Sequence, residues 1–145
     1  MKQRVITAII LVLIIVPTLI FGGLPWQILI SLIGLGAIFE WQRMNQRKLT
    51  DFDTILAMIC VFAMIHSQIL FSKISFFNNL IQLAFALMIL LLSATIWTDS
   101  YDVQDAGYTF IGALYIGLGT MSAVVTRQMS LYLLIYLVIV ITMTD

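Results

Sequence analysis

The stretch from Val5 to Phe39 reads VITAIILVLIIVPTLIFGGLPWQILISLIGLGAIF and contains no charged side chain. A helix that crosses a bilayer needs about 20 apolar residues, so this stretch has room for two. Between them lies Gly22-Gly23-Leu24-Pro25, a combination of residues that is typical of tight turns. We therefore expect a hairpin of two transmembrane helices, near Val5 to Phe21 and Leu24 to Phe39.

The remaining sequence has the same character, because 62% of the 145 residues are hydrophobic and only 10% are charged. Soluble domains carry about 25% charged residues. The apolar runs are continuous and lack the alternation of barrel strands, and a helix satisfies its own backbone groups in lipid. The predicted fold is all-α, a polytopic membrane helix bundle of about six transmembrane helices within a single domain, residues 1–145. The four further spans are predicted at Ile55 to Phe71, Leu80 to Trp97, Phe110 to Val125 and Leu131 to Thr144.

Charge distribution predicts the orientation, because Lys and Arg are more frequent on the cytoplasmic side of membrane proteins. With a cytoplasmic N-terminus, five basic residues lie inside (Lys2, Arg4, Arg43, Arg47 and Lys48) and two lie outside (Lys73 and Arg127). We therefore expect a multi-pass protein of the cytoplasmic (inner) membrane with its N-terminus inside. The loops Arg43 to Asp53 and Thr98 to Tyr108 are then cytoplasmic, and Ser72 to Asn79 is outside.

Overall charge and cysteine content exclude other classes. Seven basic and seven acidic residues leave no net charge, so no nucleic-acid partner is expected. Cys60 is the only cysteine, which excludes an internal disulfide and a cysteine-based zinc site. The Gly-x-Gly pairs lie within apolar spans and lack the Lys-Ser or Lys-Thr of a nucleotide-binding P-loop.

Acidic residues near the predicted helix ends allow two interpretations each. Glu40 could be a functional carboxylate that faces the bundle interior, or it could pair with Arg43 or Arg47 on a continuing helix, which we favour. The three aspartates Asp99, Asp102 and Asp105 could hold a divalent cation. We favour a solvated loop for them, because the sequence has no Gly-centred ligand loop.

Two uncharged features also have a structural interpretation. His66 could relay protons, but a hydrogen-bonded histidine at the membrane interface is the favoured interpretation. Small residues lie along one face of the fifth predicted span and beside it, and such residues allow close packing of helices in membranes. Gly112, Gly119 and Ala123 share this face with Ile116, and Ala113 and Gly117 form a pair of small residues beside it.

Four strings together resemble the bacterial phosphatidate cytidylyltransferases, also called CDP-diacylglycerol synthases. They are MKQRVITAII at the start, Glu40-Trp41, the run from Gly112 to Leu118, and Thr142-Met143-Thr144-Asp145. The last resembles the beginning of a family motif of the type Trp-Ala-Thr-Asp-Thr-Gly-Ala-Tyr. The family's C-terminal signature is absent, so the resemblance implies the N-terminal part of a longer pattern, a fragment that is inactive alone.

The resemblance implies a nucleotidyltransferase of phospholipid biosynthesis. It would transfer a cytidylyl group from CTP to phosphatidate, releasing pyrophosphate and giving CDP-diacylglycerol, with Mg²⁺ as the usual cofactor. Asp145 is the one residue that matches a polar motif of the family, and we expect it to be a metal ligand. The other catalytic and cofactor-binding residues are unknown, and a homodimer is left open.

Without the resemblance, two other functions remain open. A small transporter subunit would show polar or broken helices along a pathway, and only Pro17 and scattered glycines point that way. A non-catalytic membrane interaction protein would use the small-residue face from Gly112 to Ala123.

Overall fold

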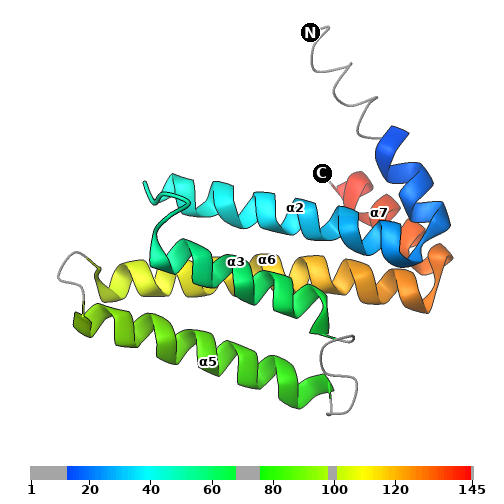
Figure 1. Cartoon of the computed structure of the whole chain (residues 1–145). Helices are drawn as coiled ribbons and strands as arrows, with labels where there is room; N and C mark the ends of the chain where they lie inside the picture. Colours follow the sequence, from blue (N-terminus) through cyan, green and yellow to red (C-terminus); the bar gives the residue numbers. More distant parts are fainter. Residues whose placement is uncertain (1–12, 68–75, 98–100, 145) are drawn as a thin grey trace, which may run out of the picture. The chain divides into compact units, whose positions relative to one another are not determined.

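The computed structural model describes residues 13–67, 76–97 and 101–144, and within these ranges the regular structure is helical, without a strand (Figure 1). This confirms the all-α prediction. Residues 13–21 are helical. The further helices are α2 (Gly23–Met44), α3 (Phe52–Ile65), α5 (Phe76–Trp97), α6 (Val103–Met129) and α7 (Leu131–Thr144).

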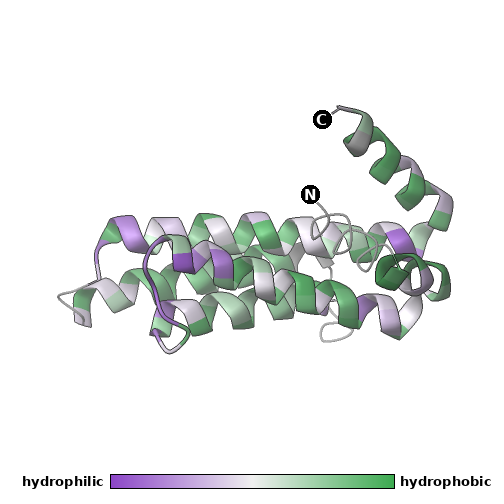
Figure 2. Cartoon of the chain, turned by 90° about the horizontal axis from the view of Figure 1, so that it is seen from above, coloured by the Kyte–Doolittle hydropathy of each residue, from purple (hydrophilic) through white to green (hydrophobic). Residues whose placement is uncertain are grey.

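Among the described residues, three helical stretches are long and apolar enough to cross a membrane: Gly23–Met44, Leu80–Trp97 and Val103–Met129. Two shorter apolar helices accompany them, Phe52–Ile65 and Leu131–Ile141. Figure 2 shows that hydrophobic residues dominate along the helices, whereas hydrophilic residues gather at the connection between α2 and α3. The protein is therefore a membrane helix bundle, as predicted.

The positions of the helix ends differ from the predicted spans at several places. Helix α2 continues beyond Phe39 to Met44, and α6 begins at Val103, inside the stretch that was predicted to be a loop. Helix α3 ends at Ile65 with His66 as its C-cap, and the last residues of the span predicted to Phe71 lie outside the described residues. The polar ends of α2 and α6 stay helical because their side chains bond to one another, as described below. The predicted beginning of α7 at Leu131 is confirmed.

The chain divides into two compact units, Ser31–Met121 and the combination of Met1–Ile30 with Ser122–Asp145. In the second of these, the predicted turn is confirmed: Gly22 ends the helical segment with a φ of 62°, and Gly23 has a φ of 58°. The Arg127 side chain donates hydrogen bonds to the carbonyl oxygens of Leu19 (2.7 Å) and Ile20 (3.0 Å). A basic group there satisfies carbonyls that the end of a helix leaves unpaired. The single-domain prediction stays a prediction.

Within Ser31–Met121, helices α2, α3, α5 and α6 alternate in direction (Figure 1). Small residues of α6 determine how closely this helix packs against its neighbours. A Cβ atom added at Gly112 would overlap the Trp41 indole, and one added at Gly117 would overlap the sulfur of Met64. The predicted packing role is therefore confirmed at these two positions. It is wrong for Gly119, which is exposed with open space around it, because it lies on the outer side of the helix.

This packing predicts that Gly117→Leu destabilises the protein in detergent more than Leu118→Ala does. The new side chain at residue 117 must displace Met64, and overpacking of this kind costs about 1–3 kcal/mol. Leu118 is 46% exposed, so its truncation removes little internal contact. Thermal unfolding of the two variants measures the difference, and equal midpoints would show that residue 117 does not pack against α3.

Candidate functional site

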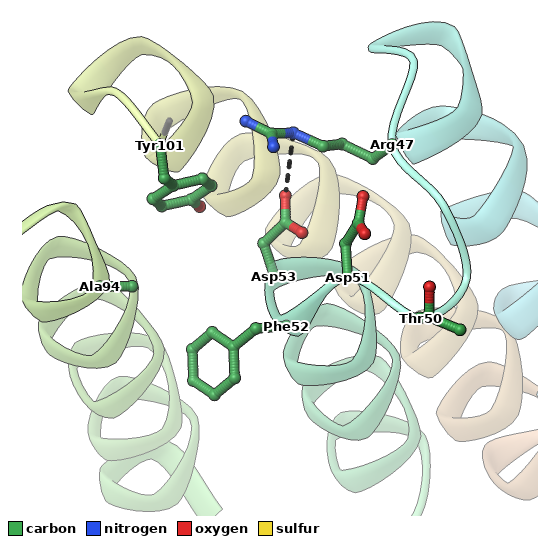
Figure 3. A pocket seen from close by; sticks show the side chains of 7 residues that line it. All are labelled: Arg47, Thr50, Asp51, Phe52, Asp53, Ala94 and Tyr101. Atoms are coloured by element: carbon green, nitrogen blue, oxygen red, sulfur yellow. Dashed lines mark ion pairs between the residues drawn. The ribbon is translucent and has the colours of Figure 1, made fainter. Parts of the chain in front are cut away.

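Arg47 lies at the centre of a polar cluster where α2 ends and where α3 and α6 begin. Its guanidinium donates through Nη2 to Oδ2 of Asp105, and its Nε lies 3.5 Å from Oδ2 of Asp53. The same guanidinium lies over the ring of Tyr101, with 5.1 Å between Cζ and the ring centroid. Figure 3 shows Arg47 reaching from the α2 side toward Asp53 and Tyr101. One cation thus connects the ends of three helices.

The local backbone explains why Arg47 faces this cluster. The N–H of Gln46 donates to the carbonyl of Arg43 (3.0 Å), and the N–H of Arg47 donates to the carbonyl of Gln42 (3.1 Å). Together these bonds form a Schellman motif, which ends a helix with one residue in the left-handed region. Gln46 takes that conformation with a φ of 59°, although glycine is the usual residue there. The motif reverses the chain immediately before Arg47.

Both carboxylates that contact Arg47 belong to first helical turns. Asp53 is in the first turn of α3, and Asp105 is in the first turn of α6. The unpaired N–H groups of a helix N-terminus favour negative charge. Asp53 accepts from the Thr54 N–H (2.9 Å), and Asp105 accepts from the Asn45 side-chain amide (3.0 Å). The helix ends and Arg47 therefore stabilise the same two negative charges.

Burial changes the acid–base properties of this cluster. Asp53, which precedes the apolar stretch that begins at Ile55, is only 3% exposed. Its burial raises the pKa of the carboxyl above the usual value, although the Thr54 N–H and Arg47 oppose this effect. Burial also raises the pKa of Tyr101 to about 12. The Tyr101 hydroxyl is buried beside the Thr109 side chain, which opposes this effect.

A second set of polar contacts joins α2 to α6 beside the cluster. The buried amide of Gln42 donates to the Thr109 hydroxyl (3.0 Å), which lies 3.5 Å from Oδ2 of Asp53. Trp41 and Tyr108 exchange two hydrogen bonds between side chain and backbone, and their rings stack with centroids 5.0 Å apart. These pairs explain why both helices continue past the predicted apolar spans.

A pocket of about 310 Å³ opens beside Arg47 (Figure 3). Arg47, Asp51 and Asp53 give it charges of both signs, and Phe52 gives it an apolar wall. Its lining residues are Arg47, Thr50, Asp51, Phe52, Asp53, Ala94 and Tyr101. Such a pocket can accept a polar group that carries positive charge or both signs of charge.

The structure corrects two interpretations of acidic residues. Glu40 is exposed, Arg47 pairs with Asp53 and Asp105, and no ion pair joins Glu40 to Arg43 among the described residues. The predicted pairing of Glu40 with Arg43 or Arg47 is therefore wrong. The predicted solvated loop is wrong for Asp105, which lies on α6 and is bound by Arg47 and Asn45. Asp102 is exposed, as a loop residue would be, and Asp99 lies outside the described residues.

The structure confirms the interpretation of His66 and leaves the predicted metal ligand untested. The hydrogen-bonded interpretation of His66 is confirmed, because its Nε2 lies 3.0 Å from the Ser31 hydroxyl oxygen and its ring packs against Phe62. Asp145, the predicted metal ligand, lies outside the described residues. Over residues 13–67, 76–97 and 101–144, no group of three or more His, Cys, Asp or Glu side chains could hold a metal ion.

Asp53 and Tyr101 were not among the sequence candidates. A signal for them was present, because both predicted loops, Arg43 to Asp53 and Thr98 to Tyr108, fell on the same side of the membrane. Charges of opposite sign in two such loops can meet at the helix ends. The sequence does not show which of them pair.

We predict that Arg47→Ala destabilises the protein by about 3 kcal/mol, because it leaves the buried Asp53 carboxylate without its countercharge. Arg43→Ala is the matched control, since Arg43 is one turn earlier and exposed. Lowering the pH should reduce the loss of stability in the Arg47→Ala variant relative to the unchanged protein, because protonation removes the uncompensated charge of Asp53. Thermal unfolding in detergent between about pH 4 and 8 measures this, a range that begins near the usual carboxyl pKa and extends above it. A deficit that is independent of pH would contradict it.

Comparison with known proteins gives a consistent result. A sequence model described as the cytidylyltransferase family matches residues 2–145. The phosphatidate cytidylyltransferase of Staphylococcus haemolyticus is 30% identical over 146 residues, covering 100% of this chain and 55% of that protein. The phosphatidate cytidylyltransferase of Bacillus subtilis is 27% identical over 138 residues, covering 94% of this chain and 51% of that protein.

The chain spans about half the length of the curated relatives it matches. No solved structure matches it significantly. The family match extends over almost every residue and agrees with the resemblance of the four sequence strings. This membrane helix bundle therefore belongs to the cytidylyltransferase family.

Proposed function

We propose that the chain forms part of a phosphatidate cytidylyltransferase, which transfers the cytidylyl group of CTP to phosphatidate. In this reaction the lipid phosphate attacks the α-phosphate of CTP, pyrophosphate leaves, and CDP-diacylglycerol forms. The observation that carries the proposal is the family match over residues 2–145, together with relatives that are named for this reaction. Helices that can cross a membrane suit an enzyme whose substrate is a lipid.

Magnesium remains a proposed cofactor. Phosphoryl transfer between two anionic substrates needs cations that offset the negative charge, and Mg²⁺ supplies this in many such enzymes. The carboxylates of the described residues do not fit this role by themselves, because Asp53 and Asp105 already pair with Arg47. Metal ligands are therefore proposed elsewhere, and Asp145 stays a prediction.

The proposed contribution of the described residues is a framework at the membrane surface. The Arg47 cluster fixes the ends of α2, α3 and α6, and it would lie at the cytoplasmic face, where CTP is available. The excess of Lys and Arg on that side supports this orientation and a location in the inner membrane. A homodimer remains a prediction.

The two other functions have less support. The family match favours neither a transporter subunit nor a non-catalytic interaction protein. Moreover, the small-residue face packs internally at Gly112 and Gly117, which makes these two positions inaccessible to a partner helix.

The orientation predicts that reporters fused after Lys48 and after Phe77 lie on opposite sides of the membrane. Lys48 follows α2, and Phe77 is at the beginning of α5, so helix α3 and the segment after it separate the two positions. A reporter active only in the cytoplasm should be active after Lys48 and inactive after Phe77. Equal activity at both positions would contradict the arrangement.

The function is tested by incorporation of radiolabelled CTP into lipid, with phosphatidate and magnesium supplied. Membranes that express the complete coding sequence containing residues 1–145 should form labelled CDP-diacylglycerol, and chelation of magnesium should abolish it. Residues 1–145 expressed alone should give no product, because the described carboxylates form no metal site. Asp145→Asn in the complete protein should lower turnover and leave membrane insertion unchanged.

Three results would contradict these expectations separately. Absence of product from the complete protein would overturn the proposed reaction. Product from residues 1–145 alone would show that this segment holds the whole active site. An Asp145→Asn enzyme with full turnover would remove that residue from the site.

A further inference from the structure

Helices α3 and α5 lie side by side in opposite directions, and both the polar pocket beside Arg47 and a separate apolar cavity are lined by residues of these two helices (Figure 1). Asp53 and Ala94 line the polar pocket, and Leu56 and Leu90, one helical turn further along each helix, line the cavity. The cavity holds about 130 Å³. Its lining residues are Leu56, Ile59, Cys60, Leu83, Ala86, Leu87 and Leu90. The seam is therefore polar at the helix ends and apolar below them.

The apolar part of the seam is open toward the surrounding membrane. Cys60 and Leu87 are buried and form its floor, whereas Ile59 is 60% exposed and Leu90 is 45% exposed at its edge. A hydrocarbon chain can enter such a groove sideways from the bilayer without displacing a polar group. The groove lies where lipid acyl chains are the surrounding solvent.

The charges that line the polar pocket decide which kind of lipid headgroup can bind there. Arg47 contributes one positive charge, while Asp51 and Asp53 contribute negative charge on the same side of the pocket (Figure 3). Arg47 is already bound by Asp105 as well. A phosphate monoester would therefore meet more negative than positive charge. A headgroup that carries both an ammonium and a phosphodiester matches the charges of the polar pocket better than a phosphate monoester does.

Tyr101 forms one wall of the polar pocket. Its ring lies against the Arg47 guanidinium, with 5.1 Å between Cζ and the ring centroid. Tyr101 is only 8% exposed, and its hydroxyl is buried beside the Thr109 side chain, so the hydroxyl does not face a ligand in the pocket. The ring therefore holds the Arg47 guanidinium in place at the pocket.

We propose that the seam between α3 and α5 binds a zwitterionic phospholipid whose headgroup carries a primary ammonium, as in phosphatidylethanolamine. The ammonium donates to Asp51, and the phosphodiester accepts from the remaining Arg47 donors. One acyl chain lies in the apolar cavity between Leu56 and Leu90. This lipid is distinct from phosphatidate, which lacks an ammonium, so the inference does not depend on the proposed reaction.

The test is native mass spectrometry of the purified full-length protein in detergent, titrated with phosphatidylethanolamine, phosphatidylcholine or phosphatidate of identical acyl chains. Phosphatidylethanolamine should bind most tightly. Asp51→Asn should weaken its binding at least about fivefold, because a charge-assisted hydrogen bond is lost. The amide oxygen can still accept from the Lys48 N–H, so the loop keeps its hydrogen bond. Asp102→Asn, which removes an exposed charge outside the pocket, should leave binding unchanged.

A second pair of variants tests the acyl chain. Ala86→Phe fills the cavity between α3 and α5, whereas Ala84→Phe places the same side chain in a different cavity, which α5 forms with Phe110 of α6. Only Ala86→Phe should weaken binding. Phosphatidate or phosphatidylcholine binding as tightly as phosphatidylethanolamine, an unaffected Asp51→Asn variant, or equal losses in the two alanine variants would overturn the proposal.

Discussion

The arrangement of the helix ends depends on one guanidinium held between two carboxylates. Arg47 contacts Asp53 and Asp105, and each carboxylate belongs to the first turn of a different helix. Near a membrane such charges are expensive unless they are paired, so removal of any one leaves the others uncompensated. The strained φ of Gln46 fits this requirement, because the reversal at that residue is what places Arg47 against the two helix starts.

Away from these helix ends, the size of the side chains determines how closely the helices pack. Lipid tails are as apolar as leucine, so helices in a bilayer gain little by burying apolar surface against one another. Gly112 and Gly117 instead allow α6 to approach Trp41 and Met64 closely, and the hydrogen bonds between Trp41 and Tyr108 fix the register of α2 against α6. Helix α5 contributes fewer small residues than α6, and three apolar cavities among the described residues lie along it.

The sequence predicts the membrane bundle well because a long uncharged run has few alternatives. It predicts the turn at Gly22 because two glycines and a proline follow one another closely there, and it also predicts the beginning of α7. It fails for the polar extensions of α2 and α6, since these stay helical only through partners about 60 residues away in the chain, as in the bond from Asn45 to Asp105. The cluster around Arg47 was missed because local spacing suggested Glu40 as its partner, whereas the folded chain supplies Asp53 and Asp105.

A double-mutant cycle between Arg47 and Asp105 tests most directly whether this cluster holds the helix ends together. Thermal unfolding in detergent is measured for the unchanged protein, Arg47→Ala, Asp105→Asn and the double variant. The structure predicts a coupling free energy of about 1 kcal/mol or more, because the pair is partly buried and directly hydrogen-bonded. The exposed pair Arg43 and Asp102 should show none in the same cycle. A coupling near zero for Arg47 and Asp105 would contradict the account.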